Sequence, residues 1–206
     1  SGSYVVACLG GGAVAGVLAR ILRDPAERLM GHVSRDKLLD LTDLDVAHRN
    51  LDAMLTEHGR QYAFASGQIA QIDLDTGVLT WTNAGHPLPL LVRGGRVVGE
   101  LSCPATPPWG LGSVVSSGRT PTVSTEALEP GDGVLFHTDG VTEARSTSGG
   151  QFGVDRLMDL LGQHAADDLE PEEIVRRLVR SVRDHRVIDL ADDATLVLVE
   201  WKGPSL

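Results

Sequence analysis

The segment FASGQIAQIDLDTGVLTWTNAGHPLPLLVRGG, residues 64–95, decides the fold class. Its short apolar runs show the period of two that is typical of half-buried strands, and turn residues separate the runs. The predicted strands are Phe64–Leu74, Val78–Thr82, Leu88–Val92 and, directly after this segment, Arg96–Leu101, with turns at Asp75-Thr76-Gly77 and Arg93-Gly94-Gly95. Strands joined by such short turns pair as antiparallel hairpins. The middle of the chain is therefore predicted to form antiparallel sheet.

Before this sheet the chain has both helical and strand patterns. Apolar residues at helical spacing predict two helices, over Ala13–Arg23 and Asp43–His58. An apolar run over Tyr4–Leu9 predicts a buried strand. The glycines Gly10, Gly11 and Gly12 would then join a strand to a helix. Such a turn either holds an anion at the helix N-terminus or lets strand and helix pack closely, because glycine has no Cβ.

After the sheet, a loop rich in Pro, Gly and Ser leads into further strands and two helices. The predicted strands are Pro121–Ala127, Gly133–His137 and Ala194–Trp201, and the predicted helices are Gly153–Gly162 and Pro171–Asp184. Helices at both ends of a mostly antiparallel middle indicate an α+β fold. A chain of 206 residues is long enough for one domain with a sizeable core, so we expect residues 1–206 to form a single domain.

Charge and composition narrow the function. The net charge is −10, from 18 Lys and Arg against 28 Asp and Glu, so nucleic acid and anionic membrane surfaces are unfavourable partners. Cys8 and Cys103 form no metal-ligand pair and suit a reducing compartment, which predicts the cytoplasm. No apolar run reaches the ~20 residues of a membrane span. Ser1-Gly2-Ser3 looks like a cloning remnant, and a start inside a longer protein, with its N-terminus truncated, fits this.

Carboxylates collect at the ends of two predicted strands. Asp139 follows one strand, and Asp192 and Asp193 precede another. Mg²⁺ and Mn²⁺ prefer oxygen ligands of this kind, and two-metal sites use them for phosphoryl chemistry. Taken singly, each motif also reads as an ordinary turn or strand boundary. The residues alone leave both interpretations open.

The combination of motifs is more specific. LEPGDGVLFHTDGVTEAR (128–145), FGVDRLMDLL (152–161) and DDATLVLVEW (192–201), together with Asn-Ala-Gly-His-Pro within residues 64–95, occur in order over nearly the whole chain. This pattern resembles the SpoIIE/RsbU-like branch of bacterial metal-dependent protein serine/threonine phosphatases, relatives of protein phosphatase type 2C. The resemblance implies two antiparallel β-sheets packed as a sandwich, with helices on both outer faces.

The resemblance also implies a site and a reaction. A water held by Mn²⁺ or Mg²⁺ attacks phosphoserine or phosphothreonine on a small regulatory phosphoprotein of the anti-sigma-factor antagonist type. No side chain beyond this water is implied as catalytic. Asp139 and Asp192 match metal ligands, Asp193 is a ligand or orients its neighbour, and Gly140 contributes its backbone. His137 lies two residues before Asp139, so its side chain is expected to face the same edge and to contact a metal ligand rather than the metal itself.

The N-terminal glycine turn departs from the family pattern. There the resemblance implies an aspartate that bridges both metals, and this chain has Ala7, or Cys8 after a one-residue slip. Neither residue has a carboxylate, and an acidic ligand on an upstream strand has no counterpart in this sequence. The chain is thus either a weak phosphatase or a degenerate, inactive domain that binds or senses a partner protein. Without the upstream strand, an open sheet edge could pair with a second copy, which predicts a homodimer.

Overall fold

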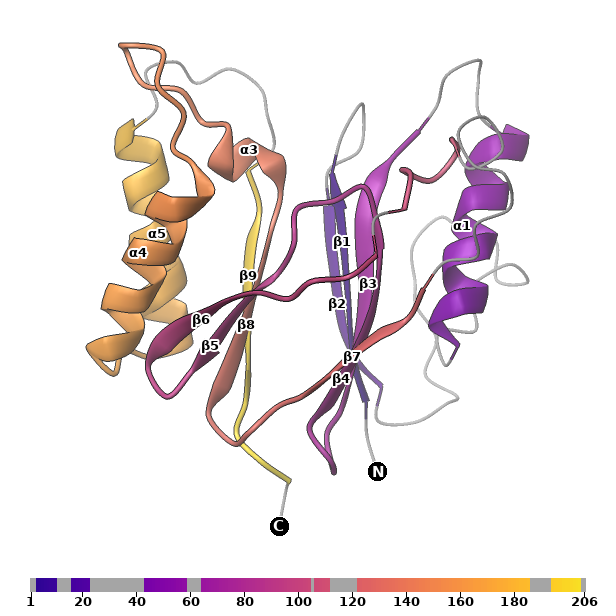
Figure 1. Ribbon diagram of the computed structural model, residues 1–206, viewed down its shortest axis with the longest axis horizontal. Coiled ribbons are helices and arrows are strands. Elements are labelled where there is room, and N and C mark those ends of the chain that lie inside the picture. Colours follow the sequence, from indigo (N-terminus) through magenta and orange to yellow (C-terminus); the bar gives the residue numbers. More distant parts are fainter. Residues whose placement is uncertain are drawn as a thin grey trace. The chain divides into compact units, whose positions relative to one another are not determined.

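The structure of the chain is a computed structural model that describes residues 3–10, 16–22, 43–58, 64–104, 106–111, 122–185 and 194–204. The chain divides into two compact units (Figure 1). The first comprises Ser1–His86, Cys103–Leu128 and Gly203–Leu206, and the second comprises Pro87–Ser102 and Glu129–Lys202. Each unit contains one antiparallel sheet and its own helices. The predicted α+β class with two antiparallel sheets is confirmed.

In its described residues, the first unit has a five-stranded sheet and one helix. The strand order is β2-β1-β3-β4-β7, and all neighbours are antiparallel. Its elements are β1 (Ser3–Gly10), β2 (Gly16–Leu22), α1 (Leu44–His58), β3 (Ser66–Asp73), β4 (Val78–Ala84) and β7 (Ser124–Ala127). The apolar face of α1 packs on β3 and β4, where Leu44, Ala47, Ile69, Ala84 and Trp109 form a buried cluster. The Asp43 carboxylate accepts hydrogen bonds from the backbone N–H groups of Asp45 and Val46, which explains where the helix begins.

The predicted helix over Ala13–Arg23 is wrong where the structure describes it, because Gly16–Leu22 is a β-strand. This strand pairs antiparallel with β1, so that Ala7 lies opposite Leu18 and Cys8 opposite Val17. A short apolar run fits a helix or a strand by period alone, and hydrogen bonds to a neighbouring strand decide between them. The predicted anion site at a helix N-terminus loses its basis, since a strand follows. Gly10 ends β1 opposite Ser66, and Gly11 and Gly12 lie outside the described residues.

Among the described strands, the edge of the sheet on the N-terminal side is formed by β2 and not by β1. β1 pairs with β2 on one side and with β3 on the other, so it is an internal strand. The homodimer expected from an open β1 edge therefore gains no support from the sheet order. It stays a prediction, which light scattering of the purified chain tests.

The Asn-Ala-Gly-His-Pro segment forms a tight turn after β4. The Asn83 side chain accepts a hydrogen bond from the His86 N–H (2.7 Å) and donates one to the His86 carbonyl (2.8 Å). Gly85 sits in the left-handed region with φ of 63°. A Cβ on Gly85 would lie 2.8 Å from Cδ and Cγ of Pro108. The turn thus requires glycine for both conformation and space.

Replacing Gly85 with alanine should cost about 3 kcal/mol of unfolding free energy, since left-handed strain and a clash with a rigid proline ring add. Gly94→Ala is the matched control, because Gly94 has a similar φ of 57° but open space where its Cβ would lie. We expect about 1–2 kcal/mol there, from strain alone. Urea denaturation of both variants measures the difference. Equal losses of unfolding free energy would show that the clash between a Cβ at position 85 and the Pro108 ring does not contribute.

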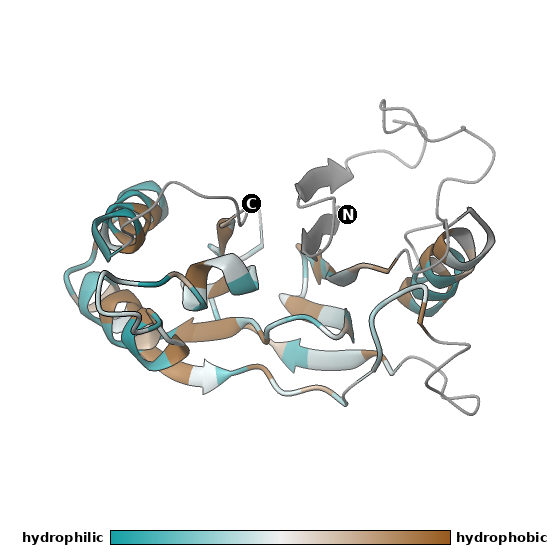
Figure 2. Ribbon diagram, turned by 90° about the horizontal axis from the view of Figure 1, so that it is seen from above, coloured by the Kyte–Doolittle hydropathy of each residue, from teal (hydrophilic) through white to brown (hydrophobic). Residues whose placement is uncertain are grey.

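The second unit is a four-stranded antiparallel sheet of order β6-β5-β8-β9, with helices α4 and α5. Its elements are β5 (Leu90–Arg93), β6 (Arg96–Glu100), β8 (Asp132–His137), α3 (Asp139–Thr142), α4 (Val154–Ala166), α5 (Pro171–His185) and β9 (Leu196–Trp201). Figure 2 shows that the helices have one hydrophobic and one hydrophilic side. Their apolar sides form the core with the sheet through Leu90, Leu135, Leu157, Leu161, Ile174 and Leu178. Both helices lie close to their predicted positions.

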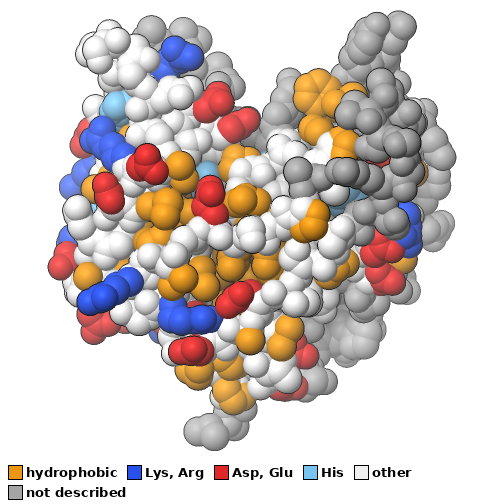
Figure 3. All heavy atoms as spheres, viewed as in Figure 1, with side chains coloured by type: hydrophobic (Ala, Val, Ile, Leu, Met, Phe, Trp, Pro, Cys, Tyr) orange, Lys and Arg blue, Asp and Glu red, His pale blue; other side chains and the backbone are white. Residues whose placement is uncertain are grey.

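Charged side chains of both signs are present on the face of the molecule in Figure 3. On the face in Figure 3, Lys and Arg side chains lie scattered among acidic ones. None of the helices that the structure describes is both long and apolar enough to cross a bilayer.

Candidate functional site

The candidate site lies in the second unit, where β8 ends and β9 begins. Thr138, directly after β8, is only 1% exposed. Its N–H donates to the Thr195 carbonyl (3.1 Å), and its Oγ1 accepts from the Thr195 N–H (2.9 Å). These two hydrogen bonds fasten the Thr-Asp-Gly motif to the residue that precedes β9. Thr195 is the last residue of the Asp-Asp-x-Thr motif, so the Thr-Asp-Gly motif lies beside the described end of that second motif.

Asp139 is the first residue of the short helix α3, and it is exposed. Its Oδ1 accepts a hydrogen bond from the Gly140 N–H (2.8 Å), and its backbone carbonyl accepts one from the Glu143 N–H (2.8 Å). Gly140 is buried. The carboxylate is thus oriented by its own turn while the side chain still reaches solvent. A carboxylate that reaches solvent is available as an oxygen ligand for a hard cation.

His137 is the last residue of β8 and is 2% exposed. Its Nδ1 lies 3.4 Å from the Thr138 carbonyl oxygen, and its Nε2 has no hydrogen-bond partner among the described residues. Burial lowers the pKa of His137, against the raising effect of the Thr138 and Leu88 backbone and of the Asp139 charge. The ring is therefore neutral near pH 7 and packs beside the Thr138 backbone. Its predicted contact with metal ligands stays a prediction.

The remaining predicted metal positions divide into two kinds. Asp192 and Asp193 lie outside the described residues, so their contribution stays a prediction. Ala7 and Cys8 lie within β1, in the first unit, and provide no carboxylate oxygen. In the part of the chain that the structure describes, no three His, Cys, Asp or Glu side chains come close enough to hold a metal ion. Among the predicted carboxylate ligands, Asp139 is the one that the structure describes, and its exposed oxygens suit a hard cation.

A buried polar group in the first unit was not predicted. His48 on α1 is 7% exposed, its Nδ1 lies 3.3 Å from Thr82 Oγ1, and its ring meets Trp109 edge-on with centroids 5.4 Å apart. One turn further on, Asp52 Oδ1 accepts a hydrogen bond from the Gly110 N–H (2.7 Å). These contacts fasten α1 to β4 and to the segment around Trp109. The sequence offered one sign of this buried group, because His48 lies on the apolar side of the helix predicted over Asp43–His58.

The His48 environment predicts a pH dependence of stability. Burial lowers the pKa of His48 below its usual 6.5, against the raising effect of the Asp52 and Asp45 charges. The unfolded chain therefore binds this proton more readily, so the stabilisation is complete above the unfolded pKa and is lost as pH falls below it. An NMR titration should place the midpoint of the His48 ring below 6.5. In His48→Gln, unfolding free energy should fall less between about pH 7 and about pH 5.5 than in the unchanged chain.

Comparison with known proteins shows which family this sequence matches. The family model described as Stage II sporulation protein E (SpoIIE) matches residues 5–202. Protein IcfG of Synechocystis sp. is 30% identical over 148 residues, which are 72% of this chain and 22% of IcfG. The chain thus spans about a fifth of that relative.

Solved structures resemble the chain in fold. The RsbU and RsbW domains of Rv1364c from Mycobacterium tuberculosis match with a TM-score of 0.61 and 23% identity, over 80% of this chain and 43% of that one. The SiaA-PP2C domain of Pseudomonas aeruginosa gives 0.60 and 21%, over 76% and 58%. The PP2C phosphatase domain of SpoIIE from Bacillus subtilis, with a regulatory fragment, gives 0.60 and 21%, over 97% and 64%. At these identities the likeness concerns the fold.

Proposed function

The chain belongs to the SpoIIE family, in the SpoIIE/RsbU-like branch of protein serine/threonine phosphatases, and from this premise we propose that it hydrolyses phosphoserine or phosphothreonine on a small regulatory phosphoprotein. The observation that carries the proposal is the double hydrogen bond between Thr138 and Thr195. It holds the Asp139 turn beside the strand that follows Asp192. A phosphatase site made from these two motifs needs this arrangement.

Within this site, the chain's own residues have separate tasks. Asp139 offers an exposed carboxylate whose orientation is set by the Gly140 N–H. Asp192 and Asp193 supply further carboxylates from the segment before Thr195. Together they would hold Mn²⁺ or Mg²⁺ by oxygen ligands. When bound, the ion supplies an activated water for attack on phosphorus and polarises the phosphoryl oxygens.

The proposed activity is weak, because the bridging position lacks a carboxylate. Ala7 supplies no ligand atom and Cys8 supplies only sulfur, which suits Mg²⁺ and Mn²⁺ poorly. This same observation favours a second candidate, an inactive domain that binds a phosphoprotein without hydrolysing it. The two candidates share the fold and differ in turnover.

The proposed partner is a phosphorylated regulatory protein of the anti-sigma-factor antagonist type. In support, one matched chain from Mycobacterium tuberculosis joins an RsbU domain to an RsbW domain. We propose no nucleic-acid partner, because the net charge of −10 would repel the phosphate backbone. We place the chain in the cytoplasm and treat residues 1–206 as one SpoIIE-like domain.

A phosphatase assay paired with calorimetry tests the proposal. Phosphoserine and phosphothreonine peptides are incubated with the chain, with and without Mn²⁺, while a parallel titration measures Mn²⁺ binding. Slow phosphate release that requires Mn²⁺ supports the enzyme. Peptide binding without phosphate release at any Mn²⁺ concentration would exclude the enzyme in favour of the binding domain.

Restoring the missing carboxylate should strengthen the site. Ala7→Asp is expected to tighten Mn²⁺ binding at least about tenfold and to raise turnover, because it adds a charge and oxygen ligands. Cys8→Asp is the matched control, as it adds the same group one residue along β1. A gain with Cys8→Asp instead would mean that the bridging aspartate of the family corresponds to Cys8 and not to Ala7. No gain with either variant would refute the view that β1 carries the lost ligand.

A further inference from the structure

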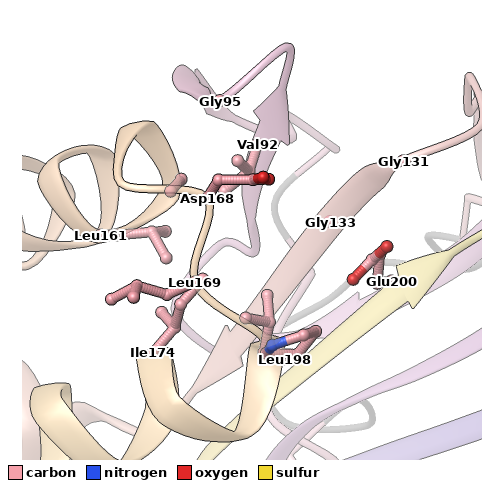
Figure 4. Close-up of a pocket in the computed structure, with 12 residues that line it drawn as sticks. Val92, Gly95, Gly131, Gly133, Leu161, Asp168, Leu169, Ile174, Leu198 and Glu200 are labelled. Atoms are coloured by element: carbon pink, nitrogen blue, oxygen red, sulfur yellow. The ribbon is translucent and has the colours of Figure 1, made fainter.

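A pocket of about 210 Å³ opens in the second unit, away from the candidate site (Figure 4). It is formed by the loop between α4 and α5, the β5–β6 turn, the start of β8 and the end of β9. Gly131 and Gly133, at the beginning of β8, line it. Asp139 follows the other end of the same strand. Gly133, which lines the pocket, lies six residues before Asp139, roughly 20 Å along an extended strand.

The floor of the pocket is apolar. Val92, Leu161, Ile174 and Leu198 line it, and the same side chains belong to or pack on the core of this unit. Glycine at position 133 keeps the space open, since a Cβ there would lie 3.4 Å from Leu198 Cδ1 and 3.6 Å from Val92 Cβ. Val92, Leu161 and Ile174 are at most 8% exposed, so the floor presents only a small apolar surface at the margin of the core. An apolar group that fills the pocket gains by leaving water.

Two carboxylates stand at the rim. In Figure 4 the Asp168 side chain extends over the pocket from the α4–α5 loop, and Glu200 on β9 lies on its other side. Asp168 has a φ of 53°, in the left-handed region, and its carboxylate makes no hydrogen bond or ion pair with any described residue. The cation next to Glu200 is Lys202, with Nζ 4.0 Å from Oε1. Glu200 thus has a cation nearby, and Asp168 provides the negative charge at the rim that no described cation pairs with.

We propose that this pocket binds small organic ammonium compounds with an apolar body, such as arylalkylamines. The apolar part would occupy the floor, and the ammonium group would pair with the rim carboxylates. Size supports a small ligand, because a cavity of about 150 Å³ holds benzene, whereas larger ligands use roughly 300–1,000 Å³. Charge excludes the opposite class, since phosphate or carboxylate ligands would meet Asp168 and Glu200. The pocket is a binding site in its own right and does not depend on phosphatase activity.

Phenethylamine and its neutral isostere 2-phenylethanol are the probes. NMR shifts of the Val92 and Leu198 methyl groups and calorimetry follow binding to the whole chain. We expect saturable shifts at these methyls, with phenethylamine bound about fivefold more tightly than 2-phenylethanol, the size of a solvent-accessible ion pair. Gly133→Ala should weaken both probes, because the added methyl fills the floor while making ordinary contacts.

Charge variants separate the pocket from general attraction to an acidic protein. Asp168→Asn should lower the preference for phenethylamine, since only Glu200 then remains at the rim, and asparagine tolerates the left-handed backbone as aspartate does. Asp167→Asn, the matched control, removes the neighbouring exposed carboxylate, which does not line the pocket, and should keep the preference. The proposal is overturned if the methyl shifts do not saturate, if both probes bind equally, or if the two variants behave alike.

Discussion

Asp139→Asn is expected to lower Mn²⁺-dependent phosphatase turnover by about a hundredfold or more, because a metal-held water supplies several kcal/mol of catalysis. The variant changes charge and little else. Asparagine has the same shape, its amide oxygen can still accept the Gly140 hydrogen bond, and the side chain is exposed. Unfolding free energy should therefore stay within about 0.5 kcal/mol of the unchanged chain. Turnover and Mn²⁺ titration with a phosphoserine peptide measure the effect.

The matched control is Asp155→Asn. Asp155 is also an exposed acidic residue in the first turn of a helix, here α4, and it is not among the predicted ligands. It should leave turnover and Mn²⁺ affinity unchanged. If Asp139→Asn keeps its Mn²⁺-dependent activity, the ion is held elsewhere and the assignment of the site fails.

Arg93→Leu should lower the unfolding free energy by about 3 kcal/mol, the low end of the cost of breaking a buried charge pair. Asp132 is 2% exposed, and its Oδ2 accepts hydrogen bonds from Arg93 Nε (2.8 Å) and from the Glu129 N–H (2.8 Å). Without Arg93, the buried carboxylate keeps a backbone donor and loses its opposite charge. The low end applies because the Arg93 side chain is 29% exposed.

Arg49→Leu gives the comparison for an exposed pair. Arg49 pairs with Asp45 along α1, where both side chains are accessible to solvent, so the loss should be below about 1 kcal/mol. Urea denaturation of both variants decides whether burial of the acid sets the cost. Adding Asp132→Asn to Arg93→Leu should recover part of the stability, since the uncompensated charge is removed. Equal losses in the two single variants would contradict this account.

Several elements were predictable because their signal is local. The helix predicted over Pro171–Asp184 is α5, Pro171–His185, whose apolar residues recur on one side of the helix. The hairpins of residues 64–101 follow from alternation and from short turns rich in glycine. In both cases, residues close in sequence contain the whole pattern. Tertiary contacts then only select among compatible arrangements.

Residues 16–22 show where this reasoning ends. Their apolar run fits a helix as well as a strand, and the deciding partners are β1 and, through β1, β3, which lies some 50 residues downstream in the sequence. The His48 contacts with Thr82 and Trp109 are equally remote in sequence. Neither follows from periodicity, because hydrogen bonds and packing across the sheet select them.

By itself, the sequence determined the family, the two antiparallel sheets, most helices and the identity of the candidate metal-binding carboxylates. Only the tertiary structure decided that β1 is internal, that Thr138 is bonded to Thr195, and that a pocket with two rim carboxylates opens beside β8. The reason is physical. Residue type and hydrophobic period reflect interactions among residues that are close in sequence. Strand partners, sheet edges and cavities depend instead on which distant segments meet and on where glycine, which has no side chain, leaves space between them.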